Sequence, residues 1–276
     1  MPSTFRLTLE YDGAAFQGWQ AQAGEVRTVQ GVLEAAIARV SGERVRVQGS
    51  GRTDAGVHAE GQAASVCLAT ALPPERLQRA LNGVLPPDLA VRDLRVAPAG
   101  FDARRSARSK LYRYALWNGP VRSPLRAARA FCLPQRLDVE AMREAARALV
   151  GTHDFRSFQA AGSSVATTVR TLLRLEIRGA PGRALALDFE GTGFLRHMVR
   201  NLVGTLVEVG TGQRAAGQMP ALLAARDRSR AGRTAPAHGL TLLRVRYEGD
   251  PEESGPQGAD SDPLIAGGDS LDRSAS

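Results

Sequence analysis

The residues whose types and spacing could do chemistry stand together at positions 50–62, in the stretch SGRTDAGVHAEGQ. One carboxylate, Asp54, follows one guanidinium, Arg52, among several glycines. Glycine lets a backbone take positive φ or approach a ligand closely. A lone carboxylate held in such a loop can act as a nucleophile or as a general acid or base. It can also be an ordinary turn residue, so the surrounding elements have to distinguish the two.

Two further features could contribute to a site around that loop. Tyr112 and Tyr114 alternate with Arg113, so both tyrosines lie on one face of a predicted strand. Aromatic side chains on an exposed sheet face can stack unpaired RNA bases, whereas core packing is the alternative, which we favour for one of the two. Arg200 falls off the apolar stripe of a long predicted helix. It is either solvated or aimed at a buried carboxylate, which it would keep ionised.

Other kinds of site find little support. Two glycine-rich stretches, at positions 49–51 and 191–193, lack the third glycine and the parallel strand pattern of a dinucleotide fingerprint. The four histidines are scattered, and no cluster has the spacing of metal ligands. The sequence also lacks the G-x-S-x-G elbow of a serine hydrolase.

Charge suggests a polyanionic partner. Of the 36 basic residues, all but Lys110 are arginine. The net charge is +8, and the last 28 residues carry seven acids and one arginine, which leaves +14 for the body. Such a body favours nucleic acid over a membrane surface, because no basic amphipathic surface helix stands out. Compositional drift toward arginine and alanine is the alternative explanation.

Composition also indicates a compartment. No apolar run approaches the roughly 20 residues that span a bilayer, and the N-terminus has no secretory signal pattern. Two cysteines, Cys67 and Cys132, cannot form a disulfide framework or a cysteine-rich zinc site. We therefore expect a cytoplasmic protein.

The elements that must position these residues follow one order twice. Alternating strands and apolar helical stripes predict β-α-β-β-α-β in each half. In the first half the predicted elements are strand 5–11, a helix from a Thr28 cap to Gly42, strands 45–48 and 62–68, helix 73–82 and strand 91–96. In the second half they are strand 110–117, a helix from an Asp138 cap to 151, strands 170–177 and 185–189, helices 194–209 and 220–226, and strand 240–247.

This repetition predicts an α+β fold of two tandem ferredoxin-like halves, whose antiparallel sheets flank a central RNA-binding cleft. The predicted domains are an N-terminal half, residues 1–105, which carries the Asp54 loop, and a C-terminal half, residues 106–248. Residues 249–276 consist mostly of Gly, Ser, Pro and Asp and predict a disordered acidic tail.

Residues 50–62 closely resemble the GRTDAGVH signature loop of the tRNA pseudouridine synthase A family, and we call them the signature loop. Other stretches match that family in the same order, so the resemblance spans about residues 5–247. They are Tyr11-Asp12-Gly13 with Phe16, Gly18, Trp19 and Gln20; Phe101-Asp102-Ala103-Arg104; Tyr112-Arg113-Tyr114; His197-Met198-Val199-Arg200-Asn201 with Gly204; Asp227-Arg228; and Gly239-Leu240. The departures are Ala59-Glu60 after His58 and the acidic tail.

The resemblance implies a homodimeric enzyme that isomerises uridine to pseudouridine at positions 38, 39 and 40 of the tRNA anticodon stem-loop, without a metal or organic cofactor. It implies that Asp54 is the catalytic aspartate and that Arg52 helps to displace the target base. Tyr112 matches the tyrosine that stacks on the uracil, and Arg200 matches the arginine that pairs with the aspartate. Leu240 aligns near the wall of the uracil pocket.

Two other functions remain open from the residues alone. The first is a non-catalytic RNA-binding protein, because tandem ferredoxin-like units also occur in RNA-recognition folds, although no RNP1-type motif is present. The second is a hydrolase that uses Asp54 with a water molecule and would release the base. Whether Asp54 attacks C1′ or C6, or removes a ribose proton to give a glycal, stays open.

Overall fold

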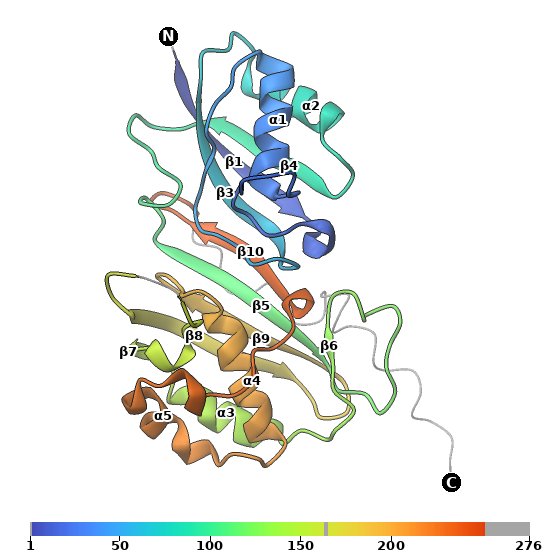
Figure 1. Cartoon of the computed structure of the whole chain (residues 1–276), viewed down its shortest axis with the longest axis vertical. Helices are drawn as coiled ribbons and strands as arrows, with labels where there is room; N and C mark the ends of the chain where they lie inside the picture. The colour runs from blue at the N-terminus through green and yellow to red at the C-terminus, as the bar shows by residue number, and fades with distance from the viewer. Residues whose placement is uncertain (1, 163–164, 252–276) are drawn as a thin grey trace. The chain divides into compact units, whose positions relative to one another are not determined.

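The computed structural model describes residues 2–162 and 165–251, which form two compact units (Figure 1). The first unit contains Met1–Leu111 and Thr241–Gly249, and the second contains Tyr112–Leu240. The chain leaves the first unit within strand β5 (Ser109–Trp117) and returns at the start of strand β10 (Leu240–Arg246). The predicted halves divide the chain at residue 105, whereas these units divide it at residue 111. The first unit also contains β10 from Thr241 onward, which pairs in parallel with β3 (His58–Leu68).

The sheet of the first unit is built around β1 (Ser3–Tyr11). β1 pairs antiparallel with β3 on one side and with β4 (Leu89–Val96) on the other. Phe5, Leu7 and Leu9 are buried, and the residues between them are more exposed. Since successive side chains of a strand point to opposite faces, this alternation turns one face of β1 into the core.

Two helices complete that core. α1 (Val29–Ser41) begins after Thr28, whose side chain accepts the Gly31 N–H, and it ends at Gly42 with a left-handed φ of 77°. α2 (Pro74–Val84) has proline in its first turn, where no N–H is needed. The two helices pack against each other, and α2 packs on β4 (Figure 1). Their fully buried apolar side chains include Leu33, Ile37, Leu77 and Leu81.

The strand predicted at 45–48 is wrong for residues 45–47, because β2 consists of Gln48–Gly49 alone. Side chains of α1 take the place of a strand partner at Val47. Its N–H donates to Glu34 Oε1 at 2.9 Å, and its carbonyl accepts from Gln30 Nε2 at 3.0 Å. The apolar pattern therefore identified a buried residue but not its hydrogen-bond partners.

The sheet of the second unit has the order β5-β9-β8-β7, and β6 (Phe131–Cys132) pairs in parallel with β5. The neighbours of β8 (Val169–Gly179) are β9 (Ala184–Gly191) and β7 (Gly151–Asp154), and both pairings are antiparallel. The helices are α3 (Val139–Arg147), α4 (Met198–Gly210) and α5 (Met219–Ala225). α3 starts at the predicted Asp138 cap, whose side chain accepts the Ala141 N–H.

The mixed α+β class and the mostly antiparallel pairing are as predicted. The first half has the predicted element order, whereas the second half gains β6 and β7, which the patterns did not indicate. α4 starts at Met198 and not at Phe194, because His197 has a left-handed φ of 61° that ends any helix approaching it.

Two further predictions concern membrane spans and the acidic tail. Among the residues that the structure describes, no helix has the length and hydropathy that a bilayer crossing needs. The predicted acidic tail lies outside the described residues from position 252 onward.

A buried ion cluster joins the strands of the second unit. Asp188 of β9 is fully buried and accepts from Arg113 Nε and Nη2 at 2.8 and 3.0 Å, and from Arg178 Nη2 at 2.7 Å. Burial by itself raises the pKa of Asp188, but hydrogen bonds from Arg113 and the charges of Arg113 and Arg178 outweigh it. The net pKa therefore lies below the usual aspartate value. The Arg113 side chain therefore has a structural role, because it binds Asp188.

Replacing Asp188 with asparagine (Asp188→Asn) should lower the free energy of unfolding by about 3–5 kcal/mol, because two arginines stay buried without their counter-charge. Urea unfolding monitored by circular dichroism measures this. Glu176→Gln is the control, because Glu176 pairs with Arg174 at 3.4 Å in a partly exposed setting and should cost about 0–1 kcal/mol. Equal losses in the two variants would contradict the importance of the cluster.

Candidate active site

The signature loop has an irregular part, residues 50–57, and a strand part, because β3 already begins at His58. Arg52 is exposed, Thr53 is buried and Asp54 is half-buried. Gly61, which the sequence suggests as a loop residue, lies inside β3. A Cβ there would come within 2.3 Å of the Leu243 carbonyl oxygen, so glycine allows β10 to approach β3.

Buried side chains hold the irregular part of the signature loop by hydrogen bonds. Ser50 Oγ donates to Gln62 Oε1 at 2.8 Å, and Gln62 Nε2 donates to the Gly51 carbonyl at 3.1 Å. The Tyr11 hydroxyl and Thr53 Oγ1 are 2.9 Å apart. Burial raises the pKa of Tyr11 to about 12, and the bonds to Thr53 and Gln62 oppose that shift. The hydroxyl therefore keeps its proton, and the backbone around Arg52 is anchored at Gly51 and at Thr53.

A second segment, residues 16–19, bonds the backbone of the loop. The Trp19 N–H donates to the Thr53 carbonyl at 3.1 Å, and the Gly56 N–H donates to the Phe16 carbonyl at 3.3 Å. Gly18 has a φ of 86°, and a Cβ there would lie 2.7 Å from the Thr53 carbonyl oxygen. Glycine is required at this close approach.

The single lysine of the chain lies under the same loop. Lys110 Nζ, on β5, donates to the Ser50 carbonyl at 2.7 Å. A Cβ on Gly51 would lie 2.9 Å from that nitrogen, so the glycine makes room for it. Burial, together with the nearby charge of Arg104, lowers the pKa of Lys110 to about 8. The sequence analysis missed this residue, although its being the one lysine among 36 basic residues was a usable signal.

In the second unit, Tyr112 and Tyr114 are both buried. The Tyr112 ring meets Phe194 edge to face, with centroids 5.2 Å apart. The Tyr114 hydroxyl donates to the Pro236 carbonyl at 2.8 Å, and Gly239 packs directly on its ring. Tyr114 is thus a core residue, as expected for one of the two tyrosines. Tyr112 does not lie on an exposed sheet face, because only 8% of its surface is exposed.

Arg200 lies on the first turn of α4 and is half-buried. Its Nε donates to the Ala235 carbonyl at 2.8 Å. Gly204 follows one turn later, and backbone fills the space beside it, since a Cβ on Gly204 would lie 1.6 Å from the Arg233 carbonyl oxygen. Burial raises the pKa of Tyr114, and the nearby charge of Arg200 opposes that shift.

The structure thus brings together Arg52 with Asp54 in the first unit. In the second unit the segment 235–240 connects Arg200, Tyr114 and Leu240, the buried first residue of β10. A hollow of about 750 Å³ in the second unit lies at the start of α3 and the end of α4, and none of the predicted residues lines it. Within the described residues, no three His, Cys, Asp or Glu side chains are grouped as metal ligands would be.

Known proteins match this chain along most of its length. A family model described as tRNA pseudouridine synthase matches residues 8–104 and 145–248, which include Arg52, Asp54, Arg200 and Leu240 but not Tyr112. The sequence thus matches a class of enzymes that form pseudouridine in tRNA. The chain belongs to the tRNA pseudouridine synthase family.

Individual relatives agree with the family model. A tRNA pseudouridine synthase A of Myxococcus xanthus is 47% identical over 253 residues, which cover 92% of this chain and 95% of the relative. Those of Syntrophotalea carbinolica and Geobacillus kaustophilus are 46% and 47% identical over 245 and 251 residues, covering 89% and 90% of this chain and 96% of each relative. The resemblance drawn from the sequence motifs is confirmed.

The burial of Lys110 gives a pH test of the loop anchor. Between the folded pKa of about 8 and the ordinary 10.5, the unfolded chain binds the proton and the folded chain does not. The free energy of unfolding should therefore rise with pH across this window. Urea unfolding at about pH 7.5 and about pH 9 measures the rise, because unfolded tyrosines, with an ordinary pKa of about 10, are still mostly protonated there. Lys110→Met should lack it, and an equal rise in both proteins would exclude Lys110 as its source.

Proposed function

We propose that this protein isomerises uridine to pseudouridine at positions 38, 39 and 40 of the tRNA anticodon stem-loop, with Asp54 as its catalytic residue. The observation that carries the proposal is family membership, which makes the protein an isomerase acting on uridine in tRNA. The choice of positions and the roles of individual residues come from the motif resemblance.

The proposed reaction begins with exposure of the target base. A nucleotide inside a stem must leave the stack before its glycosidic bond can be reached, which costs a few kcal/mol. We assign Arg52 to the space that the base vacates, and its exposed position in the signature loop agrees with contact to RNA. The arginine-rich body, with its net charge of +14, favours phosphate contacts and hence salt-sensitive binding.

The chemistry then exchanges one bond to the ribose for another. The bond from C1′ to N1 breaks, the uracil turns, and a bond from C1′ to C5 forms. C5 loses its proton and N1 gains one, so the mass does not change. Asp54 acts as an anion, either as a nucleophile or as a base. We assign Tyr112, Arg200 and Leu240 to substrate binding, with Tyr112 stacking on the uracil and accepting the C5 proton.

Several finer predictions accompany this function. The two units are proposed to be tandem ferredoxin-like halves, which the element order β1-α1-β2-β3-α2-β4 of the first unit supports. The protein is proposed to be a cytoplasmic homodimer that needs no metal or organic cofactor. Size measurement in solution and activity after chelator treatment test the last two points.

Asp54→Asn should bind tRNA normally but slow pseudouridine formation by roughly 10³-fold or more, because the amide cannot act as an anion. Release of tritium from tRNA labelled at uridine C5 measures the reaction. Glu60→Gln is a matched control, since Glu60 is an exposed acid of the same loop. Normal product from Asp54→Asn would refute the assignment. Wild-type protein that binds tRNA without tritium release would favour the non-catalytic alternative, and loss of base would indicate hydrolysis.

Tyr112→Phe keeps the ring and removes the hydroxyl. If the hydroxyl accepts the C5 proton, the single-turnover rate should fall by about 10²-fold or more while tRNA affinity is kept. Tyr247→Phe is the control, because its buried hydroxyl bonds the Ala103 carbonyl at 2.7 Å and serves structure. A Tyr112→Phe rate equal to that of the wild type would rule out this proton acceptor.

A further inference from the structure

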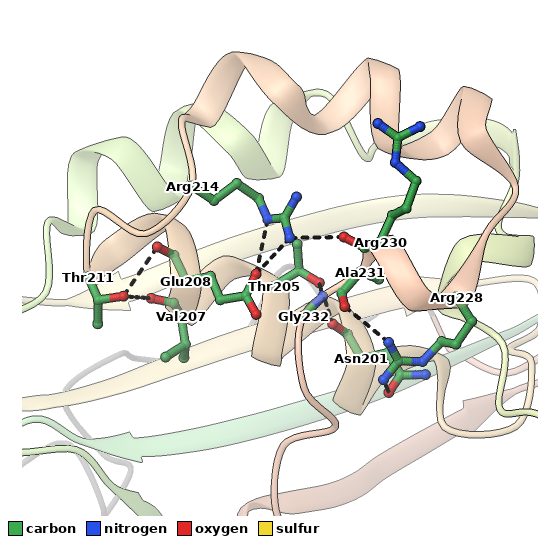
Figure 2. Close-up of polar contacts among 10 residues, drawn as sticks. All are labelled: Asn201, Thr205, Val207, Glu208, Thr211, Arg214, Arg228, Arg230, Ala231 and Gly232. Atoms are coloured by element: carbon green, nitrogen blue, oxygen red, sulfur yellow. Dashed lines mark hydrogen bonds and ion pairs between the residues drawn. The ribbon is translucent and has the colours of Figure 1, made fainter.

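The segment 231–235 lies along α4 at unusually close range. A Cβ on Gly232 would be 2.8 Å from Thr205 Cα, and one on Gly204 would be 1.6 Å from the Arg233 carbonyl oxygen. The Gly232 N–H donates to Thr205 Oγ1 at 2.9 Å (Figure 2). Two glycines, one on each side, thus allow backbone to rest directly on the helix. We call residues 231–235 the α4 strap.

Arg228 and Asn201 hold the strap by a closed set of hydrogen bonds. Arg228 Nη2 donates to Asn201 Oδ1 at 3.0 Å and to Thr234 Oγ1 at 3.1 Å. Thr234 Oγ1 in turn donates to Asn201 Oδ1 at 2.7 Å. Arg228 Nη1 donates to the Ala231 carbonyl at 3.2 Å, so one guanidinium binds the strap at Ala231 and at Thr234 (Figure 2).

Asn201 is the fixed point of this set. It is fully buried, and its Nδ2 donates to the Phe158 carbonyl at 2.8 Å. This bond orients the amide, so Oδ1 faces Arg228 and Thr234. The strap is therefore tied to the interior of the second unit through one side chain.

Ala235, at the end of the strap, forms hydrogen bonds with both the side chain and the backbone of Arg200. The Ala235 carbonyl accepts from Arg200 Nε at 2.8 Å, and the Ala235 N–H donates to the Arg200 carbonyl at 3.1 Å. The next carbonyl, that of Pro236, accepts from the core residue Tyr114. The direction of the Arg200 guanidinium thus depends on where the strap places Ala235.

We propose that Arg228 is a positioning residue for the reaction, which holds the Asn201–Thr234 pair and thereby sets the orientation of Arg200. This inference rests on the proposed function, in which Arg200 binds the substrate. Direct contact of Arg228 with tRNA is the competing role. The geometry favours positioning, because Arg228 is half-buried and its guanidinium donates to three protein oxygens.

The experiment compares variants in single-turnover tritium release and in tRNA affinity at several salt concentrations. Arg228→Ala should lower the rate by about 10- to 100-fold through misplacement of Arg200. Its salt dependence of binding should match the wild type, whereas loss of a phosphate contact would reduce the slope by about one. Thr234→Val, which removes one hydroxyl with little change of shape, should lower the rate in the same direction.

Two controls separate geometry from charge. Arg230→Ala removes an exposed arginine two positions away, whose guanidinium points away from the cluster (Figure 2), and should leave the rate unchanged. Arg228→Lys keeps the charge without the planar guanidinium that donates to three oxygens, so it should remain slow. Full activity in Arg228→Lys would overturn the proposal.

The decisive measurement is a double-mutant cycle. If Arg228 acts through Arg200, the Arg200→Ala/Arg228→Ala protein should be no slower than Arg200→Ala, within about 2-fold. Multiplied losses would show that Arg228 acts independently and would overturn the proposal. Wild-type tritium release is measured first, so failure of the proposed function is seen separately. If Arg228→Ala does not fold, the same cycle with Thr234→Val decides the outcome.

Discussion

An irregular, glycine-rich loop can hold a carboxylate in one place only if its own backbone groups are bonded, because unsatisfied buried polar groups cost free energy. Around Asp54 this requirement is met from three directions. Carbonyls on its N-terminal side accept from Lys110 of β5, from Gln62 of β3 and from the backbone of Trp19. The shape of the loop therefore depends on the packing of the whole first unit, and its sequence of small residues leaves space for those donors.

In the second unit, irregular backbone that lies against a helix also has to be hydrogen-bonded. The α4 strap has no regular structure, yet it rests on α4 where Gly204 and Gly232 remove the side chains that would separate the two backbones. Asn201 and Arg228 then supply the hydrogen bonds that a sheet or helix would otherwise provide. In both units, glycines permit a close approach and long polar side chains fix it. This combination fixes irregular backbone beside the residues that are proposed for the site.

Local signals predicted the elements well. Thr28 and Asp138 cap helices as expected, and alternation along β1 marks its buried face. The incorrect predictions concern features that local sequence patterns do not encode. Val47 is bonded by side chains of α1, and Gly61 makes room for β10. His197 takes a left-handed backbone conformation that the neighbouring residues in the sequence do not indicate. In each case a contact or a backbone conformation overrode the local preference.

The sequence by itself determined the family and supplied the candidate site residues, because motifs such as the signature loop consist of consecutive residues. It also determined most helices and strands, whose periodicity depends on near neighbours. Tertiary structure alone decided which polar side chains became anchors and where Tyr112 and Tyr114 are buried. Lys110 meets Ser50 across 60 positions of sequence. A hydrogen bond needs its partners within about 3 Å in space, and spacing along the chain does not encode that distance.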